Sequence, residues 1–212
     1  MEALVFAGGD AVDARWHSRL REPALVIAAD SGLEHVHALG LRADVVVGDM
    51  DSVSSSTLDR AIAAGTRVEE HPSSKDATDL ELALGTAKRA GATRVTVLGA
   101  GGGRLDHFLA NALLLASPAW ADLEIHALMG PARVAVVRRA TELHGSVGSL
   151  VTLLPPIGPA RGVCTTGLRW TLDAEELLPG STRGVSNEMT EPVATVTLTE
   201  GVLLAIQPHG GS

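Results

Sequence analysis

Four short apolar segments of this chain each end in an acidic or glycine-rich turn, and this pattern constrains the fold most. The segments with their turns are Ala24–Asp30, Asp44–Ser52, His71–Asp79 and Thr96–His107. Each turn follows β-forming residues and precedes a helical pattern, so strands are predicted to alternate with helices. In an open α/β sheet, ligands bind at the carboxyl ends of the strands. We therefore expect these four turns to lie along one edge of a sheet.

Up to about residue 118 the alternation predicts βαβ units, and hence a mainly parallel sheet with helices on its faces. The expected strands are Ala3–Ala7, Ala24–Ala29, Val45–Val47, Arg67–Glu70 and Arg94–Leu98. The strongest helical pattern is Thr78–Arg89, where apolar residues recur at i, i+3, i+4 and i+7. A second helix is predicted to start near Arg104, with Leu105, Leu109 and Leu113 on one face.

After Trp120 the pattern changes to short strands separated by glycine and proline turns. The expected strands are Asp122–Leu128, Arg133–Val137, Ser149–Leu154, Ala194–Thr199 and Val202–Gln207. Short strands at close spacing are typical of a sandwich or a barrel. We predict an α/β domain over residues 1–120 and an all-β domain over residues 121–212, with the boundary near Ser117–Asp122.

The composition narrows the possible partners. A net charge of −8 disfavours a nucleic-acid backbone, which clustered Lys and Arg would bind. Aromatic residues, at 2%, are too few to form stacking platforms for single strands. A small phosphorylated ligand carried with Mg²⁺ remains compatible, because carboxylates then hold the metal. With one cysteine, no signal peptide and no membrane-spanning run, we expect a soluble, cytoplasmic protein.

Asp49 and Asp51 stand two residues apart, directly after an apolar segment. Two carboxylates at this spacing can share one hard cation, and Gly48 allows a tight turn beneath them. The structural alternative is that Asp51 or Ser52 caps the following helix. Because a cap explains only one residue of the pair, we interpret the pair as metal ligands.

Lys75-Asp76-Ala77-Thr78-Asp79 stands at the start of the strongest helical pattern. Asp76 at the N-cap and Asp79 three residues later would form an acidic capping box. A carboxylate in the first turn of a helix can also offer an oxygen to a metal, so the two interpretations are compatible. Lys75 could meet a phosphate as a point charge.

Gly99–Gly103 forms a glycine-rich turn between a strand and a helix. Such a turn lets backbone N–H groups approach phosphate oxygens. It lacks the spacing of a dinucleotide fingerprint and the Gly-Lys-Ser/Thr ending of a P-loop. Arg104 can bind phosphate as a fork, and His107 and Asn111, four residues apart, share a helix face.

Trp170 is the candidate aromatic contact in a chain with three tryptophans and no tyrosine. Its indole is either a core residue or a flat face for a heteroaromatic, cationic ligand. Trp16 and Trp120 are interpreted as packing residues. No cluster of His and Cys predicts zinc, so any metal is expected to be a hard, oxygen-bound ion.

Together these motifs resemble those of the thiamine pyrophosphokinases, in the order of that family and over nearly the whole chain. The motifs are Ala29–Gly32, Gly48–Ser52, Lys75–Asp79, Gly103–His107 with Asn111, Thr166–Trp170 and Val185–Glu188. The resemblance implies an N-terminal α/β domain, a C-terminal β-sandwich for thiamine binding and dimerisation, and homodimers with sites between subunits. It also implies transfer of the pyrophosphoryl group of ATP to thiamine, giving AMP and thiamine diphosphate. Two features depart from the family pattern: Ser31 replaces a frequent glycine, and Pro155–Cys164 fits no motif.

The resemblance implies a role for each matching residue. The magnesium carboxylates are Asp49, Asp51 and Asp79, and Asp30 and Asp106 complete the catalytic set, either one a candidate proton acceptor. The ATP or phosphate contacts are Lys75, Asp76, Thr78, Gly101, Gly102, Gly103, Arg104, His107 and Asn111. The thiamine contacts are Trp170, Ser186 and Asn187.

Three alternatives remain open from the sequence. A pterin alcohol could replace thiamine as the acceptor, although Trp170 and Ser186-Asn187-Glu188 favour thiamine. A sensor of nucleotide or thiamine diphosphate would bind through the same turns without releasing AMP. A metal-dependent phosphohydrolase would use water in place of the alcohol. The full set of acidic residues argues against the sensor.

Overall fold

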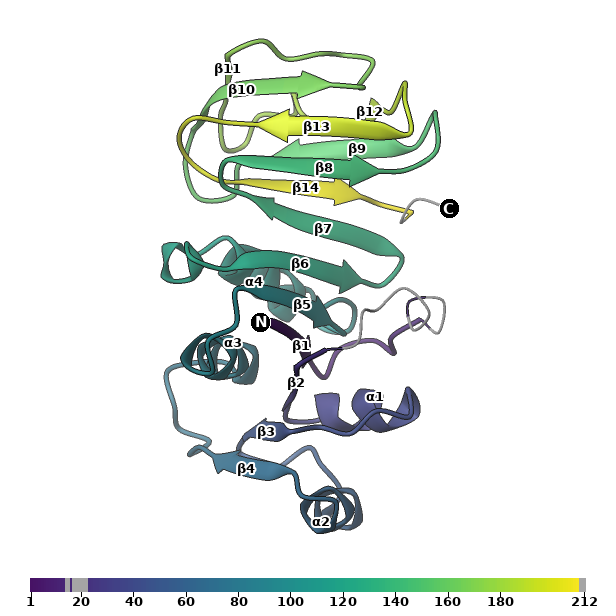
Figure 1. Ribbon diagram of the computed structural model, residues 1–212. Coiled ribbons are helices and arrows are strands. Elements are labelled where there is room, and N and C mark those ends of the chain that lie inside the picture. Colours follow the sequence, from purple (N-terminus) through teal and green to yellow (C-terminus); the bar gives the residue numbers. More distant parts are fainter. Residues whose placement is uncertain (14–15, 17–22, 210–212) are drawn as a thin grey trace. The chain divides into compact units, whose positions relative to one another are not determined.

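The computed structural model describes residues 1–13, 16 and 23–209, which form two compact units (Figure 1). The first unit consists of Met1–Asn111 with Asp122–Gly130, and the second of Ala112–Ala121 with Pro131–Ser212. This division differs from the boundary predicted near residue 120. The physical reason is that the strand following Asp122 pairs in parallel with a strand of the first unit.

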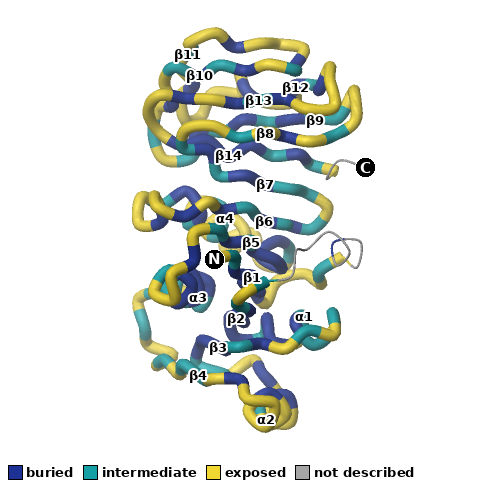
Figure 2. The backbone as a smooth tube through the Cα atoms, viewed as in Figure 1, coloured by how far each residue is buried: buried dark blue, intermediate teal, exposed yellow. Residues whose placement is uncertain are grey.

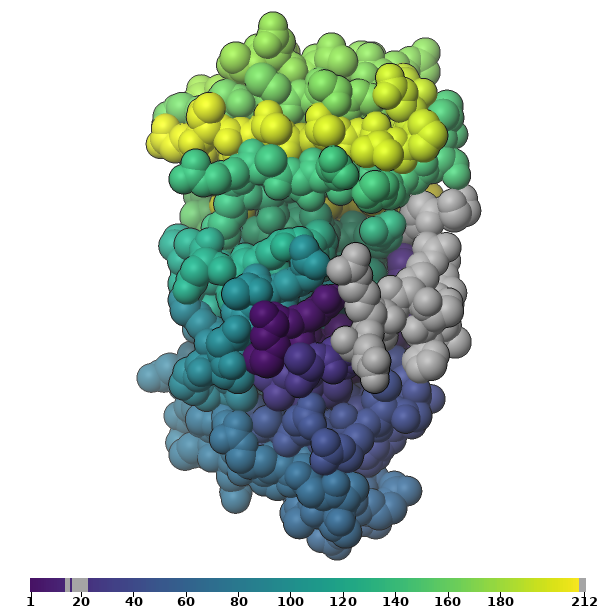
Figure 3. Space-filling model, in the orientation of Figure 1, coloured from purple at the N-terminus to yellow at the C-terminus, as the bar shows by residue number. Residues whose placement is uncertain are grey.

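The sheet of the first unit is parallel throughout, as the sequence predicts. Its strand order is β6-β5-β1-β2-β3-β4, and every neighbouring pair is parallel. The strands are β1 (Glu2–Phe6), β2 (Leu25–Ala29), β3 (Val45–Gly48), β4 (Arg67–Glu70), β5 (Arg94–Leu98) and β6 (Glu124–Met129). The central strands β1, β2 and β3 are almost fully buried, as expected for parallel strands covered on both faces (Figure 2). The chain begins at the surface, where the first residues are visible in purple in Figure 3.

Two helices cover the central strands from opposite sides (Figure 1). The helices of this unit are α1 (Gly32–Ala38), α2 (Ser55–Ala63), α3 (Asp79–Arg89) and the start of α4 (Leu105–Leu115). Leu33 and Val36 of α1 belong to the same buried apolar cluster as Leu4 and Phe6 of β1. Helix α3 packs on β1, β2 and β3, and its predicted apolar stripe is buried. These contacts fix the start of α3 beside the ends of β2 and β3.

The helix caps differ from those predicted. The capping box with Asp76 at the N-cap is wrong, because Thr78 is the N-cap of α3 and its Oγ1 accepts from Glu81 N at 3.3 Å. Neither Asp51 nor Ser52 caps α2, since Ser54 has that position and accepts from Thr57 N. Capping therefore does not account for the predicted acidic residues.

The predicted leucine face of α4 is present but exposed. The exposed fractions are 70% for Leu105, 52% for Leu109 and 51% for Leu113, and Phe108 beside them is 36% exposed. Within α4, Leu115 is buried. A helix this apolar normally buries such a face against another element.

The second unit is a β-sandwich, which confirms the predicted all-β architecture. One layer has the order β12-β9-β14-β7, from Asn187–Glu188, Leu150–Leu154, Leu203–Gln207 and Ala132–Val137. The other has the order β11-β10-β13-β8, from Glu175–Leu177, Ala160–Thr166, Val193–Thr197 and Ala140–His144. All the pairings in these layers are antiparallel, and buried apolar side chains of both layers form one core. Strands β8, β10, β11 and β12 were not predicted.

Within the described residues, no helix combines the length and apolar character needed to cross a membrane.

Candidate active site

Three aspartates from distant parts of the chain meet at the carboxyl edge of the parallel sheet. Asp30 follows β2, Asp49 follows β3, and Asp79 is the first residue of α3. One carboxylate oxygen from each lies within 4.8 Å of the others. The structure therefore brings together the predicted ligands Asp49 and Asp79, and adds Asp30 to them. Three carboxylates at this separation suit a hard divalent cation.

Lys75 lies against this cluster. Its Nζ is 2.8 Å from Oδ1 of Asp79 and 3.6 Å from Oδ2 of Asp49. The hydrogen bond to Asp79 raises the pKa of the Lys75 ammonium, so Lys75 is charged at neutral pH. A hydrogen bond from the Ser73 hydroxyl lowers the pKa of the Asp49 carboxyl, and the charge of Lys75 acts in the same direction. Both contacts favour ionised ligands in the cluster.

Asp30 is the most buried of the three, with an exposed fraction of 8%. Its Oδ1 has no hydrogen-bond partner in the described part of the chain. Burial raises the pKa of the Asp30 carboxyl, a hydrogen bond from Ser52 opposes this, and the nearby charges of Asp79 and Asp51 raise the pKa further. A buried carboxylate oxygen without a donor, beside two more carboxylates, fits an oxygen-liganded Mg²⁺.

Asp51 lies outside the cluster. In a strand, Asp49 and Asp51 would point to the same face, because side chains alternate. Met50 between them has φ +61°, a left-handed conformation that breaks this alternation. Asp51 is exposed, and its Oδ1 accepts from Ser52 Oγ at 2.9 Å. The role of Asp51 as a magnesium ligand therefore stays a prediction.

Gly48 makes the close approach of the carboxylates possible. It has φ +150°, and a Cβ at this position would lie 3.0 Å from Asp79 Oδ1 and 3.1 Å from Asp30 Cβ. Asp30 itself has φ +46°. Residues other than glycine rarely adopt positive φ, and they occur more often at functional sites.

Replacing Asp30 by asparagine is expected to raise the melting temperature of the metal-free protein at neutral pH. The neutral amide removes the charge of a buried carboxylate whose Oδ1 has no donor in the described part of the chain, and a buried polar atom left without a partner costs about 1–3 kcal/mol. Each kcal/mol corresponds to about 2–4 °C in a chain of this length. Because the folded-state pKa of Asp30 is raised, its ionisation destabilises the fold above that pKa, and this cost disappears below the ordinary carboxyl pKa. Thermal scans with EDTA at neutral and acidic pH measure this difference, and equal melting temperatures at neutral pH would contradict it.

The glycine-rich turn after β5 lies at the same edge of the sheet. Gly101 is buried, while Gly103, Arg104 and His107 are exposed. The Arg104 guanidinium binds Asp106 at 3.1 and 2.5 Å, and this pairing lowers the pKa of the Asp106 carboxyl to about 2. These predicted phosphate contacts thus belong to one turn and the start of the helix after it, but their contact with phosphate stays a prediction.

Two other predicted phosphate contacts support the local structure, and a third is exposed in a loop. Asn111 Nδ2 donates to Ala100 O at 3.1 Å, so Asn111 supports the glycine-rich turn. Thr78 caps α3, and Asp76 is exposed in the loop before it.

Sequence reasoning missed the loop after β1. Gly9 N donates to Gly99 O, and Asp10 N donates to Gly101 O, each at 2.8 Å. A Cβ on Gly9 would lie 2.3 Å from Gly101 O, so this approach requires glycine. Gly8-Gly9-Asp10 follows an apolar strand just as the four predicted turns do, and this signal could have identified it.

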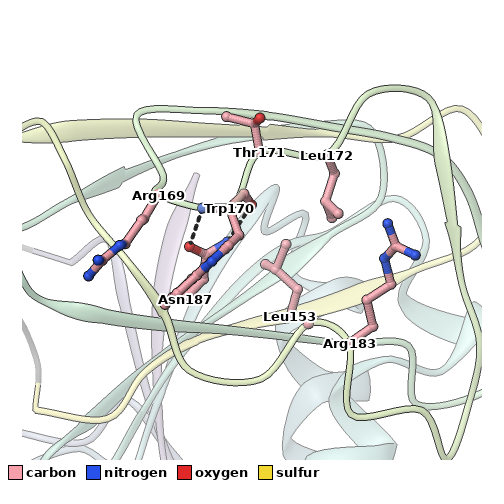
Figure 4. Close-up of a pocket in the computed structure, with 8 residues that line it drawn as sticks. Leu153, Arg169, Trp170, Thr171, Leu172, Arg183 and Asn187 are labelled. Atoms are coloured by element: carbon pink, nitrogen blue, oxygen red, sulfur yellow. Dashed lines mark hydrogen bonds between the residues drawn. The ribbon is translucent and has the colours of Figure 1, made fainter.

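The second unit contains a pocket of about 520 Å³ beside Trp170 (Figure 4). It is lined by Leu153, Arg169, Trp170, Thr171, Leu172, Arg183, Gly184 and Asn187. This volume and the mixture of apolar and polar groups are typical of small-molecule sites. Trp170 is 55% exposed, whereas Trp16 and Trp120 are buried as predicted. Ser186 is exposed and precedes the lining residue Asn187 in the sequence, but it does not line the pocket itself.

Sequence comparison places this arrangement in a family. Residues 16–127, more than half of the chain, match the family described as thiamin pyrophosphokinase, catalytic domain. Residues 141–203 match thiamin pyrophosphokinase, vitamin B1 binding domain. The chain belongs to the thiamin pyrophosphokinase family. The first match contains the acidic cluster and the glycine-rich turn, and the second contains the Trp170 pocket.

Relatives of this thiamin pyrophosphokinase family member come from bacteria and plants. A thiamine pyrophosphokinase of Bacillus subtilis is 26% identical over 193 residues, which cover 88% of both chains. Thiamine pyrophosphokinase 2 of Arabidopsis thaliana is 29% identical over 174 residues. That match covers 77% of this chain and 64% of the plant protein, so the chain spans less than two thirds of that relative.

Solved structures of the family share the fold. The thiamine pyrophosphokinase of Bacillus subtilis superposes with a TM-score of 0.86 at 23% identity, covering 100% of both chains. The thiamin pyrophosphokinase of Geobacillus thermodenitrificans has a TM-score of 0.82 at 25% identity and covers 98% of this chain and 97% of its own.

Proposed function

We propose that this protein transfers the pyrophosphoryl group of ATP to the hydroxyl of thiamine, giving thiamine diphosphate and AMP. The observation that carries the proposal is the cluster of Asp30, Asp49 and Asp79 in a chain of the thiamin pyrophosphokinase family. The match to a vitamin B1 binding domain favours thiamine over a pterin alcohol as the acceptor.

Asp30, Asp49 and Asp79 are the residues that would hold Mg²⁺. A bound Mg²⁺ would neutralise charge on the phosphate oxygens of ATP. Lys75, already placed between two of these carboxylates, contributes a second positive charge at the same point. We assign Arg104 and the amides of the glycine-rich turn to the remaining phosphate oxygens.

Positioning and charge neutralisation are expected to supply most of the acceleration. Asp106 is a weak base at neutral pH, because the Arg104 pairing holds its pKa at about 2. Its role in this proposal is to orient the Arg104 guanidinium, and abstraction of the thiamine hydroxyl proton need not depend on it.

One assay tests the proposed function directly. The protein is incubated with Mg²⁺ and ATP, with and without thiamine, and the products are identified by mass. We expect AMP and thiamine diphosphate in equal amounts, and only when thiamine is present. Phosphate or AMP without an acceptor would indicate a hydrolase, and no product would indicate a sensor. If a pterin alcohol offered in place of thiamine reacts faster, the pterin alcohol is the acceptor.

We further propose that the protein is a homodimer and that the exposed apolar face of α4 lies in the subunit contact. Leu105, Phe108, Leu109 and Leu113 form this face, and each is at least 36% exposed. Single exposed apolar residues are ordinary, but a contiguous apolar surface indicates an interaction site. Burying four large side chains in a second copy would remove this surface from water.

The double substitution Leu109→Glu, Leu113→Glu is expected to convert the dimer to a monomer, because it places charges in the proposed contact. Light scattering after size exclusion would then give half the wild-type mass. Ile62→Glu is the matched control, since Ile62 is 50% exposed on α2 and lies outside the proposed contact. A monomeric wild type, or a double variant that stays dimeric, would contradict the assignment.

A further inference from the structure

Asn187 commits its side-chain amide to the backbone of Trp170. Its Oδ1 accepts from Trp170 N at 3.1 Å and its Nδ2 donates to Trp170 O at 2.7 Å (Figure 4). Its Oδ1 also accepts from Glu188 N at 2.9 Å. A primary amide offers two N–H donors and one oxygen with two lone pairs, so three of its four bonding positions are used. At 8% exposure, Asn187 has little surface left for a ligand.

Trp170 lies in a part of the chain that lacks regular strand pairing. It falls between β10 and β11, next to an isolated bridge of Leu168 with Met189 and a backbone bond from Arg169 N to Glu188 O at 2.9 Å. Asn187 therefore supplies, through its side chain, the paired hydrogen bonds that a neighbouring strand would otherwise give. Asn187 itself is held in β12, which pairs with β9.

The indole of Trp170 is exposed although its backbone is fixed. Arg169 lies over the ring, with its guanidinium carbon 5.2 Å from the centroid. Glu188 anchors that guanidinium at 2.8 Å. Asn187 and Glu188 thus hold Trp170 from two directions, one through the backbone and one through the ring. Figure 4 shows Trp170 with Asn187 at one side of the pocket, and Leu153, Leu172 and Arg183 farther along it.

We propose that Asn187 is a positioning residue, which fixes the Trp170 indole as a preformed wall of the pocket for a cationic heteroaromatic substrate. This deepens the proposed function and rests on it for the identity of the ligand. The family resemblance implied direct contact between Asn187 and thiamine, whereas the hydrogen bonds indicate action through Trp170. Stacking on an indole depends on where its face lies, and a ring fixed in advance loses less freedom on binding.

Replacing Asn187 by alanine removes both bonds to Trp170. We expect the KM for thiamine to rise about 10-fold to 100-fold, as for other losses of substrate positioning, with the KM for ATP unchanged. Asn187→Asp keeps the size of the side chain and the two accepted bonds, but it places a carboxylate oxygen against Trp170 O in place of the donor, so the KM for thiamine should rise in this variant as well. The aspartate variant also keeps the test valid if the alanine variant does not fold.

A second readout needs no substrate. Trp16→Phe and Trp120→Phe leave Trp170 as the sole tryptophan of the chain. In this background, fluorescence anisotropy decay reports the motion of the Trp170 indole, and Asn187→Ala should increase the amplitude of its fast motion. The anisotropy therefore tests whether Asn187 restrains Trp170, even if the wild type fails to pyrophosphorylate thiamine.

Gln207→Ala provides a matched control for the loss of a buried amide in the same unit. Gln207 is 4% exposed and donates to His144 O at 3.0 Å, away from the pocket lining. We expect it to lower stability without changing the KM for thiamine or the motion of Trp170. The proposal is overturned if Asn187→Ala keeps the wild-type KM for thiamine. It is also overturned if affinity falls while the motion of Trp170 is unchanged, because Asn187 would then contact the substrate itself.

Discussion

Replacing Asp79 by asparagine is expected to lower kcat by about 10²-fold to 10³-fold, the range for losing one preorganised electrostatic group. The substitution removes one of three clustered carboxylates and the 2.8 Å ion pair with Lys75. Asparagine keeps the size of the side chain, and Thr78 still caps α3, so the fold should persist. The measurements are the rate of AMP formation and the affinity for Mn²⁺ by electron paramagnetic resonance, which should fall together.

Asp59→Asn is the matched control for this change of charge. Asp59 is exposed on α2, so its loss should leave both the rate and the Mn²⁺ affinity near the wild-type values. A wild-type rate for Asp79→Asn would refute the assignment. A slow variant with unchanged Mn²⁺ affinity would place Asp79 in another role.

Asp51→Asn then tests the predicted ligand that lies outside the cluster. If Asp30, Asp49 and Asp79 suffice, the Mn²⁺ affinity of this variant should fall far less than that of Asp79→Asn. An equal fall would show that Asp51 also binds the metal.

The sequence is sufficient to predict the edge of the sheet at which the site forms. Asp49 and Asp79 could be predicted to meet because each follows a strand or opens a helix in a parallel arrangement, where the carboxyl ends share one edge. Asp30 ends another of the turns expected at this edge, but its place directly beside Asp49 depends on the pairing of β2 with β3, which local pattern does not give. The separation of Asp51 accompanies the left-handed conformation of Met50, which residues other than glycine rarely adopt and which local pattern does not predict.

What the sequence leaves unpredicted differs between the β-sandwich and α4. β10 begins within the stretch Pro155–Cys164, which fitted no motif. It was not predicted because its strand character depends on partners distant in sequence. On α4 the periodicity gives the apolar face correctly but cannot say what covers it. For Asn187, the motif identifies the residue, but its hydrogen bonds to the backbone of Trp170 join parts of the chain that the motif does not relate.

Gly48→Ala is expected to destabilise the fold and to weaken the metal site, because Gly48 both has a positive φ and lies against two of the clustered aspartates. Alanine at φ +150° is strained, which costs about 1–3 kcal/mol, or about 2–4 °C in melting temperature for each kcal/mol. Its Cβ would also press on Asp79 Oδ1 at 3.0 Å and on Asp30 Cβ at 3.1 Å. Because those contacts displace two ligands at once, the Mn²⁺ affinity should fall about 10-fold to 100-fold, as for other changes in the groups supporting a metal site.

Gly91→Ala separates backbone strain from contact with the ligands. Gly91 has φ +85° after α3, and a Cβ there would meet no atom within 4 Å. We expect it to lower the melting temperature while leaving Mn²⁺ affinity and turnover unchanged. If Gly48→Ala merely matched this control, the cluster would tolerate the added methyl group. The positive φ at Gly48 would then serve the turn after β3 alone, and the close approach of Asp30 and Asp79 would need another explanation.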